Sequence, residues 1–104
     1  MPTRYDLTPD ARRDIRSLWL YTVAEWGERQ ADRYIRLLET GMQRIAQRRT
    51  VPRRFSERYP QVLVSRCEHH YIFYIHPDGQ KPRILAVLHE HMDLLTRLVE
   101  RLAP

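Results

Sequence analysis

The chain has 104 residues, the size of one domain with a single core, and we expect one domain over residues 1–104. Hydrophobic residues make up 42% and charged residues 30%, a balance that excludes wholesale disorder and is typical of a folded globular protein. The net charge of +5 comes almost entirely from arginine, because Lys81 is the only lysine, and it favours an anionic partner such as nucleic acid or an acidic polypeptide.

Cysteine content and hydropathy limit the compartment and the cofactors. Cys67 is the only cysteine, so an internal disulfide and a zinc site with two thiolates are both excluded. No stretch approaches the roughly 18 consecutive apolar residues of a membrane span, and the first seven residues lack the apolar core of a signal peptide. We expect a cytoplasmic protein with no membrane contact and no cofactor.

The N-terminal half predicts a short strand at residues 3–7 and two helices. Thr8 can cap the first helix, and Pro9 suits its first position, where no amide donor is missed. The first helix carries an apolar stripe at intervals of three and four residues: Ala11, Ile15, Leu18, Trp19, Thr22 and Trp26. Its two tryptophans are favoured as core residues, with a partner groove as the alternative. Gly27 then supplies a left-handed terminus, and Glu28 opens the second helix. Its apolar stripe is Ala31, Tyr34, Ile35, Leu38, Met42 and Ile45. So short a connection requires the helices to fold back on each other.

The C-terminal half predicts a loop, three strands and a last helix. Residues 48–60 hold two prolines and five arginines and have no regular pattern. Three runs rich in β-branched and aromatic residues follow, at 62–66, 71–75 and 83–89. A turn at 77–79 makes them an antiparallel meander, and Asp93 can cap a helix with an apolar stripe at Leu94, Leu95, Leu98, Val99 and Leu102. The order β-α-α-β-β-β-α predicts an α+β fold, with the N-terminal helical hairpin and the short C-terminal helix on one face of a small antiparallel sheet.

Five histidines fall on the predicted sheet and its ends: His69, His70, His76, His89 and His91. Imidazole transfers protons near neutral pH, and Arg66 or Arg83 could stabilise a phosphorane-like charge, so the ingredients of a metal-free ribonuclease are present. Alternation along a strand puts His69 and His70 on opposite faces, so only a subset could converge. We therefore favour surface and sheet-edge histidines.

Metal binding and cysteine nucleophilicity are weaker interpretations. His89 and His91 share one side of an extended strand, but no third ligand follows at a fixed spacing, and we predict no metal. Cys67 could be a nucleophile only with a lowered pKa and a base such as His69, so a structural thiol is favoured. The sequence pattern does not decide whether Phe73 belongs to the core or contacts a partner.

Five segments, in order, resemble the ParE branch of the RelE/ParE toxin superfamily, and they cover nearly the whole chain. They are residues 7–11 (LTPDA), 21–27 (YTVAEWG), 30–34 (QADRY), 71–74 (YIFY) and 84–93 (ILAVLHEHMD). The resemblance implies the toxin of a type II toxin–antitoxin pair, which traps the cleaved-DNA state of DNA gyrase and breaks no bond itself. It also implies a cognate antitoxin that wraps a flexible segment around the toxin. Contact with DNA would then be indirect, through gyrase or the antitoxin.

On this resemblance, the apolar and basic faces around the sheet and the last helix are expected to hold the antitoxin. The expected antitoxin contacts are Trp19, Arg66, Phe73, Arg83, Leu95 and Leu98. The expected target contacts are Arg83, His91, Met92, Arg97 and Arg101.

The RelE branch gives the alternative function. This branch shares the fold, and resemblance to it would imply cleavage of mRNA on the ribosome. The catalytic residues would then be His91, Arg66 and His69. His91 stands where ParE-like sequences usually have arginine, and a histidine there resembles the end of some RelE-branch nucleases. No lysine lies in the second helix or the loop, which favours the ParE branch. A copy that binds antitoxin but has lost toxicity is the third possibility.

Overall fold

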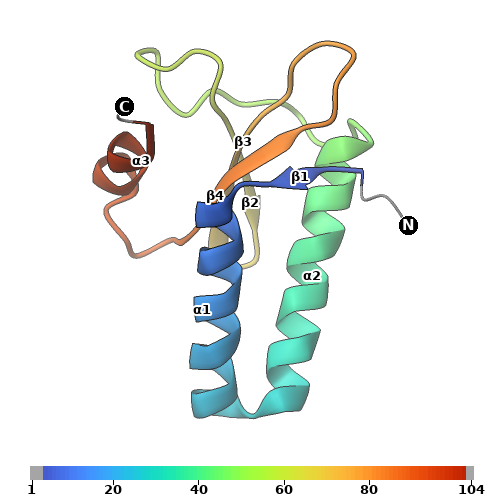
Figure 1. Ribbon diagram of the computed structural model, residues 1–104, viewed down its shortest axis with the longest axis vertical. Coiled ribbons are helices and arrows are strands. Elements are labelled where there is room, and N and C mark those ends of the chain that lie inside the picture. The colour runs from blue at the N-terminus through green and yellow to red at the C-terminus, as the bar shows by residue number, and fades with distance from the viewer. Residues whose placement is uncertain (1–3, 103–104) are drawn as a thin grey trace.

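The computed structural model describes residues 4–102, which form three helices and a four-stranded sheet (Figure 1). In chain order the elements are β1 (Asp6–Leu7), α1 (Pro9–Trp26), α2 (Glu28–Ala46), β2 (Leu63–Cys67), β3 (His70–Ile75), β4 (Arg83–His89) and α3 (Leu94–Leu102). The predicted order of elements is confirmed. The predicted first strand is shorter than expected, and its residue 3 lies outside the described residues.

The sheet has the strand order β1-β4-β3-β2. Strands β2, β3 and β4 form the predicted antiparallel meander. Strand β1 adds to it in parallel with β4, through the pairs Asp6 with Arg83 and Leu7 with Ile84, so the sheet is mixed rather than purely antiparallel. Because β1 is so short, the edge of β4 beyond Ile84 has no partner strand among residues 4–102.

The chemistry at the ends of the helical hairpin is as the sequence predicts. Thr8 accepts a hydrogen bond from the backbone N–H of Ala11 at 3.1 Å, and Pro9 is the first helical residue. Gly27 has φ of 90°, a conformation that favours glycine, and it joins α1 directly to α2. The two helices run side by side along one face of the sheet, and their connection projects past the strands (Figure 1).

One member of the predicted apolar stripe of α1 was placed wrongly. Trp26 is 73% exposed, although its spacing puts it in line with the buried Ala11 and Thr22. It is the last residue of α1, and most of its side chain stays exposed at this end of the hairpin. The hairpin projects beyond the sheet there (Figure 1).

Two apolar clusters lie on opposite faces of the sheet. The first joins α1 and α2 to Ile72, Tyr74 and Ile84. The second is built from Val62, Phe73, Ala86, Leu88 and Leu98. Because Leu98 belongs to α3, the expectation that all helices share one face is wrong for α3, which covers the face opposite the hairpin.

A bulge in β4 shifts the pattern of buried residues. Phe73 pairs with Ala86 and Tyr74 pairs with Ile84, which leaves Leu85 as an extra residue in β4. The carbonyl of Leu85 accepts hydrogen bonds from Thr8 Oγ1 at 3.3 Å and from Arg101 Nη1 at 3.2 Å. The bulge therefore ties the start of α1 and the end of α3 to the open edge of β4.

Helix α2 approaches β2 closely at a glycine. A Cβ at Gly41 would lie 3.0 Å from Cys67 Sγ and 3.4 Å from Ile72 Cδ1, tighter than ordinary packing distances. This close approach seats α2 on β2 and β3. Within residues 4–102, no helix is both long enough and apolar enough to cross a bilayer.

Candidate functional site

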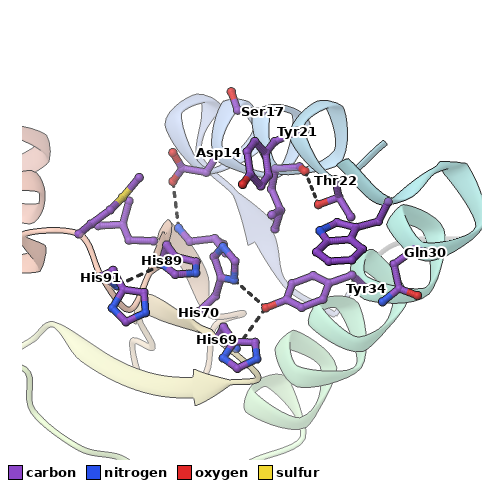
Figure 2. Close-up of a pocket in the computed structure, with 15 residues that line it drawn as sticks. Asp14, Ser17, Tyr21, Thr22, Gln30, Tyr34, His69, His70, His89 and His91 are labelled. Carbon is purple, nitrogen blue, oxygen red and sulfur yellow. Dashed lines mark hydrogen bonds between the residues drawn. The ribbon is translucent and has the colours of Figure 1, made fainter. Parts of the chain in front are cut away.

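A groove of about 730 Å³ opens between the helical hairpin and the ends of β3 and β4 (Figure 2). Helix α1 lines it with Asp14, Ser17, Leu18, Tyr21, Thr22 and Trp26, and α2 with Gln30 and Tyr34. The sheet side consists of His69, His70, Val87, Leu88, His89, His91 and Met92. We call this the histidine groove, since four of the five histidines line it.

The helical wall of the histidine groove is aromatic and open. Tyr21 is 64% exposed, Trp26 is 73% exposed, and Met92 on the facing wall is 45% exposed. Large apolar side chains gathered around a concavity are typical of a partner site, because burying an aromatic ring contributes about 1.5–3 kcal/mol. Tyr21 is not among the site residues expected from the sequence. Tyr21 lies seven residues after Asp14 and four after Ser17, so the three side chains share one side of the helix. This spacing was the signal in the sequence that could have identified it.

His70 and Tyr34 form the floor of the histidine groove. His70 is 6% exposed, and its Nδ1 lies 2.7 Å from the hydroxyl of Tyr34, which also accepts the backbone N–H of His69 at 3.1 Å (Figure 2). Burial, reinforced by the neighbouring His89, lowers the pKa of His70 to about 4, so the ring is neutral at physiological pH. Because the Tyr34 oxygen already accepts from His69, we assign its proton to the bond with His70. His70 therefore fixes α2 to β3 and is no ready proton donor.

Mild acid is expected to destabilise the protein through His70. Its pKa is about 4 in the folded state and near the ordinary 6.5 when unfolded, so the unfolded chain takes up the proton first as the pH falls. The free energy of unfolding is expected to drop by about 1–2 kcal/mol between about pH 7.5 and pH 5. Urea titrations at the two pH values measure it.

The matched variant for this pH effect is His70→Asn, which keeps a hydrogen-bond acceptor for Tyr34 but does not titrate. It should lose most of the pH dependence. A smaller part should remain, because burial also lowers the pKa of His76. An unchanged pH dependence in His70→Asn would contradict the assignment.

Glu90 gathers the three residues that the nuclease alternative requires. Its carboxylate accepts from Arg66 Nη2 at 2.7 Å and lies 3.0 Å from His69 Nδ1 and 3.9 Å from His91 Nε2. The hydrogen bond from His69, assisted by the charge of Arg66, lowers the pKa of Glu90. The carboxylate therefore stays ionised and holds the imidazole of His69 and the guanidinium of Arg66 at one side of the groove, with the exposed imidazole of His91 nearby. Glu90 is not among the site residues expected from the sequence.

The remaining chemical candidates are inert or unassembled in the described part of the chain. Cys67 is half-buried, its thiol lies 3.4 Å from the carbonyl of Leu37, and burial raises its pKa, which disfavours the thiolate. The rings of His89 and His91 lie 5.0 Å apart. Within residues 4–102, no group of three or more His, Cys, Asp or Glu side chains could hold a metal ion.

The residues expected to contact an antitoxin do not form one surface. Phe73 and Leu98 are both 0% exposed and pack in the cluster beneath α3. Trp19 is half-buried between the helices, where its Nε1 donates to Asp32 at 3.1 Å. Arg66, Arg83 and Leu95 are exposed, at the Glu90 cluster, at the start of β4 and on α3 respectively. A partner could reach Leu98 only if α3 moved away, and Phe73 is covered in addition by the ring of Phe55, whose centroid lies 5.0 Å from its own.

The residues expected to contact the target are also divided. His91 and Met92 lie together at the histidine groove and are exposed, and Arg97 is exposed on α3. Arg83 lies at the other end of β4. Arg101 is held instead by Asp14, through bonds of 2.7 Å from Nη1 to Oδ2 and 2.5 Å from Nη2 to Oδ1.

Comparison with known proteins gives consistent matches. The sequence model of a family described as "ParE toxin of type II toxin-antitoxin system, parDE" matches residues 5–94. The chain is 44% identical over 100 residues to Toxin ParE from Escherichia coli, which covers 96% of this chain and 97% of that one. It is 30% identical over 94 residues to Toxin ParE1 from Mycobacterium tuberculosis, covering 90% and 96% of the two chains.

A solved structure has the same fold. It is described as "Chromosomal ParDE TA system from P. aeruginosa", and the superposition has a TM-score of 0.70 at 18% identity. The alignment covers 82% of this chain and 92% of the other. The likeness to the ParE branch that the sequence predicts is confirmed by these comparisons.

Proposed function

This chain belongs to the ParE toxin family of type II toxin–antitoxin systems, and from that premise we propose that it binds DNA gyrase and stabilises the cleaved-DNA complex of that enzyme. The observation that carries the proposal is the 44% identity to Toxin ParE, which extends over 96% of this chain. In this mechanism the toxin acts by binding in the cytoplasm and breaks no bond itself. Growth stops because gyrase cannot reseal the DNA.

The gyrase proposal is tested with purified gyrase, plasmid DNA, ATP and toxin. After removal of protein, linear cleaved plasmid is expected to accumulate with increasing toxin. Undisturbed supercoiling without cleaved product would overturn the gyrase assignment.

The histidine groove is the proposed seat of the cognate antitoxin. Its open wall offers Tyr21, Trp26 and Met92 to apolar anchors. Arg66 beside it donates to Glu90 through Nη2 and to the Glu68 carbonyl through Nε, which leaves Nη1 to pair with a carboxylate of the antitoxin. A flexible segment gains from such a site because the buried rings offset the entropy lost when it becomes ordered. We expect the segment to carry apolar anchors flanked by acidic residues.

Removing the aromatic wall is expected to weaken neutralisation. The double variant Tyr21→Ala/Trp26→Ala should lower the affinity for the antitoxin at least about 100-fold, since two exposed anchors contribute roughly 3 kcal/mol together. Leu20→Ala is the matched control, because Leu20 is 54% exposed on α1 but does not line the groove. Calorimetric titration with the cognate antitoxin measures the effect. Equal affinities for the double variant and the control would place the antitoxin elsewhere.

A second candidate function, ribosome-dependent mRNA cleavage, is favoured by one observation. His69, His91 and Arg66 converge on Glu90 at one side of the groove. Such a cluster could transfer a proton and stabilise phosphorane charge. Cleavage of mRNA on translating ribosomes by the wild type, abolished in His69→Ala/His91→Ala, would support it. Intact mRNA with the wild type would exclude it.

A further inference from the structure

The face of α2 that points away from the sheet carries a row of arginines. Arg29, Arg33, Arg36 and Arg44 recur at intervals of four, three and eight residues, and all four are exposed. These intervals keep them on one side of the helix, opposite the buried Ala31 and Leu38. At 1.5 Å per residue the row is about 22 Å long. We call these four residues the arginine stripe.

The arginine stripe is not neutralised by the protein itself. Among residues 4–102, the arginines in ion pairs with carboxylates are Arg13, Arg66 and Arg101, none of which belongs to the stripe. The acidic residues of α2 lie on its flank toward α1, where Asp32 accepts from Trp19. Within residues 4–102 the guanidinium groups of the stripe therefore face solvent without a paired carboxylate, and five more arginines follow α2 in the chain at residues 48–58.

The chemistry of this face suits a phosphate backbone better than an acidic peptide. A docking peptide needs apolar anchors, and Leu37, 42% exposed, is the large apolar side chain bordering the stripe. Duplex DNA is bound non-specifically by positive charge alone, and guanidinium groups pair bidentately with phosphate oxygens. Each strand of a duplex carries one phosphate per about 3.4 Å of axis, so 22 Å of stripe spans about 6 phosphates of one strand.

We infer that the arginine stripe binds the phosphate backbone of double-stranded DNA, so that the toxin contacts DNA directly and not only through its partners. The inference rests on the proposed function, because the DNA that the stripe would contact in the cell is the DNA held in the gyrase complex. The stripe shares no residue with the histidine groove. One surface would thus bind nucleic acid and another the antitoxin.

The test measures binding of the isolated toxin to a short labelled duplex by fluorescence anisotropy, at salt concentrations between about 50 and 200 mM. The variant is Arg33→Gln/Arg36→Gln. The control is Arg4→Gln/Lys81→Gln, which removes the same charge from exposed positions outside α2. Circular dichroism establishes that both are folded.

The stripe variant should reduce the slope of log affinity against log salt by about 2, because each lost phosphate contact removes about 0.9. The control should reduce it by less than about 0.5. Equal reductions in the two variants, or a wild-type slope near zero, would overturn the inference.

Running the same proteins in the gyrase cleavage assay separates the two proposals. The stripe variant should need a higher concentration than the control to trap cleaved plasmid. If the wild type traps cleaved plasmid but both variants show equal salt slopes, the DNA surface is wrong and the gyrase proposal stands. If the wild type traps none but the slopes differ, the gyrase proposal fails and the DNA surface stands.

Discussion

Replacing Leu98 with Ala is expected to lower the free energy of unfolding by about 3 kcal/mol and the melting temperature by roughly 15 °C. Leu98 is 0% exposed and is the residue of α3 at the centre of the second apolar cluster, against Val62, Phe73, Ala86 and Leu88. Truncating it leaves a cavity that the strands cannot close, because they are fixed by their pairing in the sheet. The face of the sheet opposite the hairpin would lose its main contact with α3.

The matched control for this variant lies one turn earlier in the same helix. Leu95 is 53% exposed, so Leu95→Ala makes the same chemical change without a cavity and should alter stability by less than about 0.5 kcal/mol. Thermal and urea unfolding of the two variants measure the difference. Equal losses of stability would mean that α3 does not pack as described.

The second large effect is expected from Arg101→Ala, which should cost about 2–3 kcal/mol. Arg101 forms two bonds with Asp14, and its Nη1 also donates to the carbonyl of Leu85. Asp14 in turn accepts from the backbone N–H of Val87 at 2.9 Å. Without Arg101, the carboxylate remains largely buried, with one hydrogen-bond donor in place of three. The bulge carbonyl of Leu85 also loses a donor.

Arg97→Ala is the control for charge, because Arg97 is exposed on the same helix and forms no ion pair within residues 4–102. Hydrogen exchange of residues 94–102 is the decisive measurement, since Arg101 should hold the end of α3 to α1 and β4. Faster exchange there in Arg101→Ala, with no change in Arg97→Ala, is expected. Similar stability and similar exchange in both variants would show that the ion pair does not anchor α3.

Helix α3 therefore governs which predicted contacts a partner can reach. Phe73 and Leu98 are covered while α3 is in place, and Arg101 is occupied by Asp14. The histidine groove and the arginine stripe are open without any movement of α3. This is why the two binding proposals rest on those surfaces.

The local elements were predictable because their signals lie within a few residues. The cap at Thr8, the start at Pro9 and the turn at Gly27 each depend on one residue and its neighbours, and the structure has all three. The strands at 62–66, 71–75 and 83–89 were found within one residue at each end, since alternation and β-branched composition are properties of the strand itself.

The errors arose where an element meets another one distant in the chain. Helical spacing put Trp26 on the buried stripe, but spacing does not say where the neighbouring sheet stops. The face covered by α3 was missed, because an amphipathic helix can dock on either side of a sheet whose two faces are both apolar. The sequence pattern does not predict the bulge at Leu85. The carbonyl of this residue accepts the hydrogen bonds from Thr8 and Arg101.

By itself, the sequence determined the order of elements, the helical hairpin, the antiparallel meander and the likeness to ParE toxins. Only the tertiary structure decided that Tyr34 meets His70, that Arg101 holds Asp14, and that three of the proposed site residues converge on Glu90. Apart from the contact between the neighbours Glu90 and His91, these contacts join residues 21 to 87 positions apart. Which distant groups meet depends on strand order, register and the docking of α3. Those features are settled by the packing of the whole chain, which no short segment encodes.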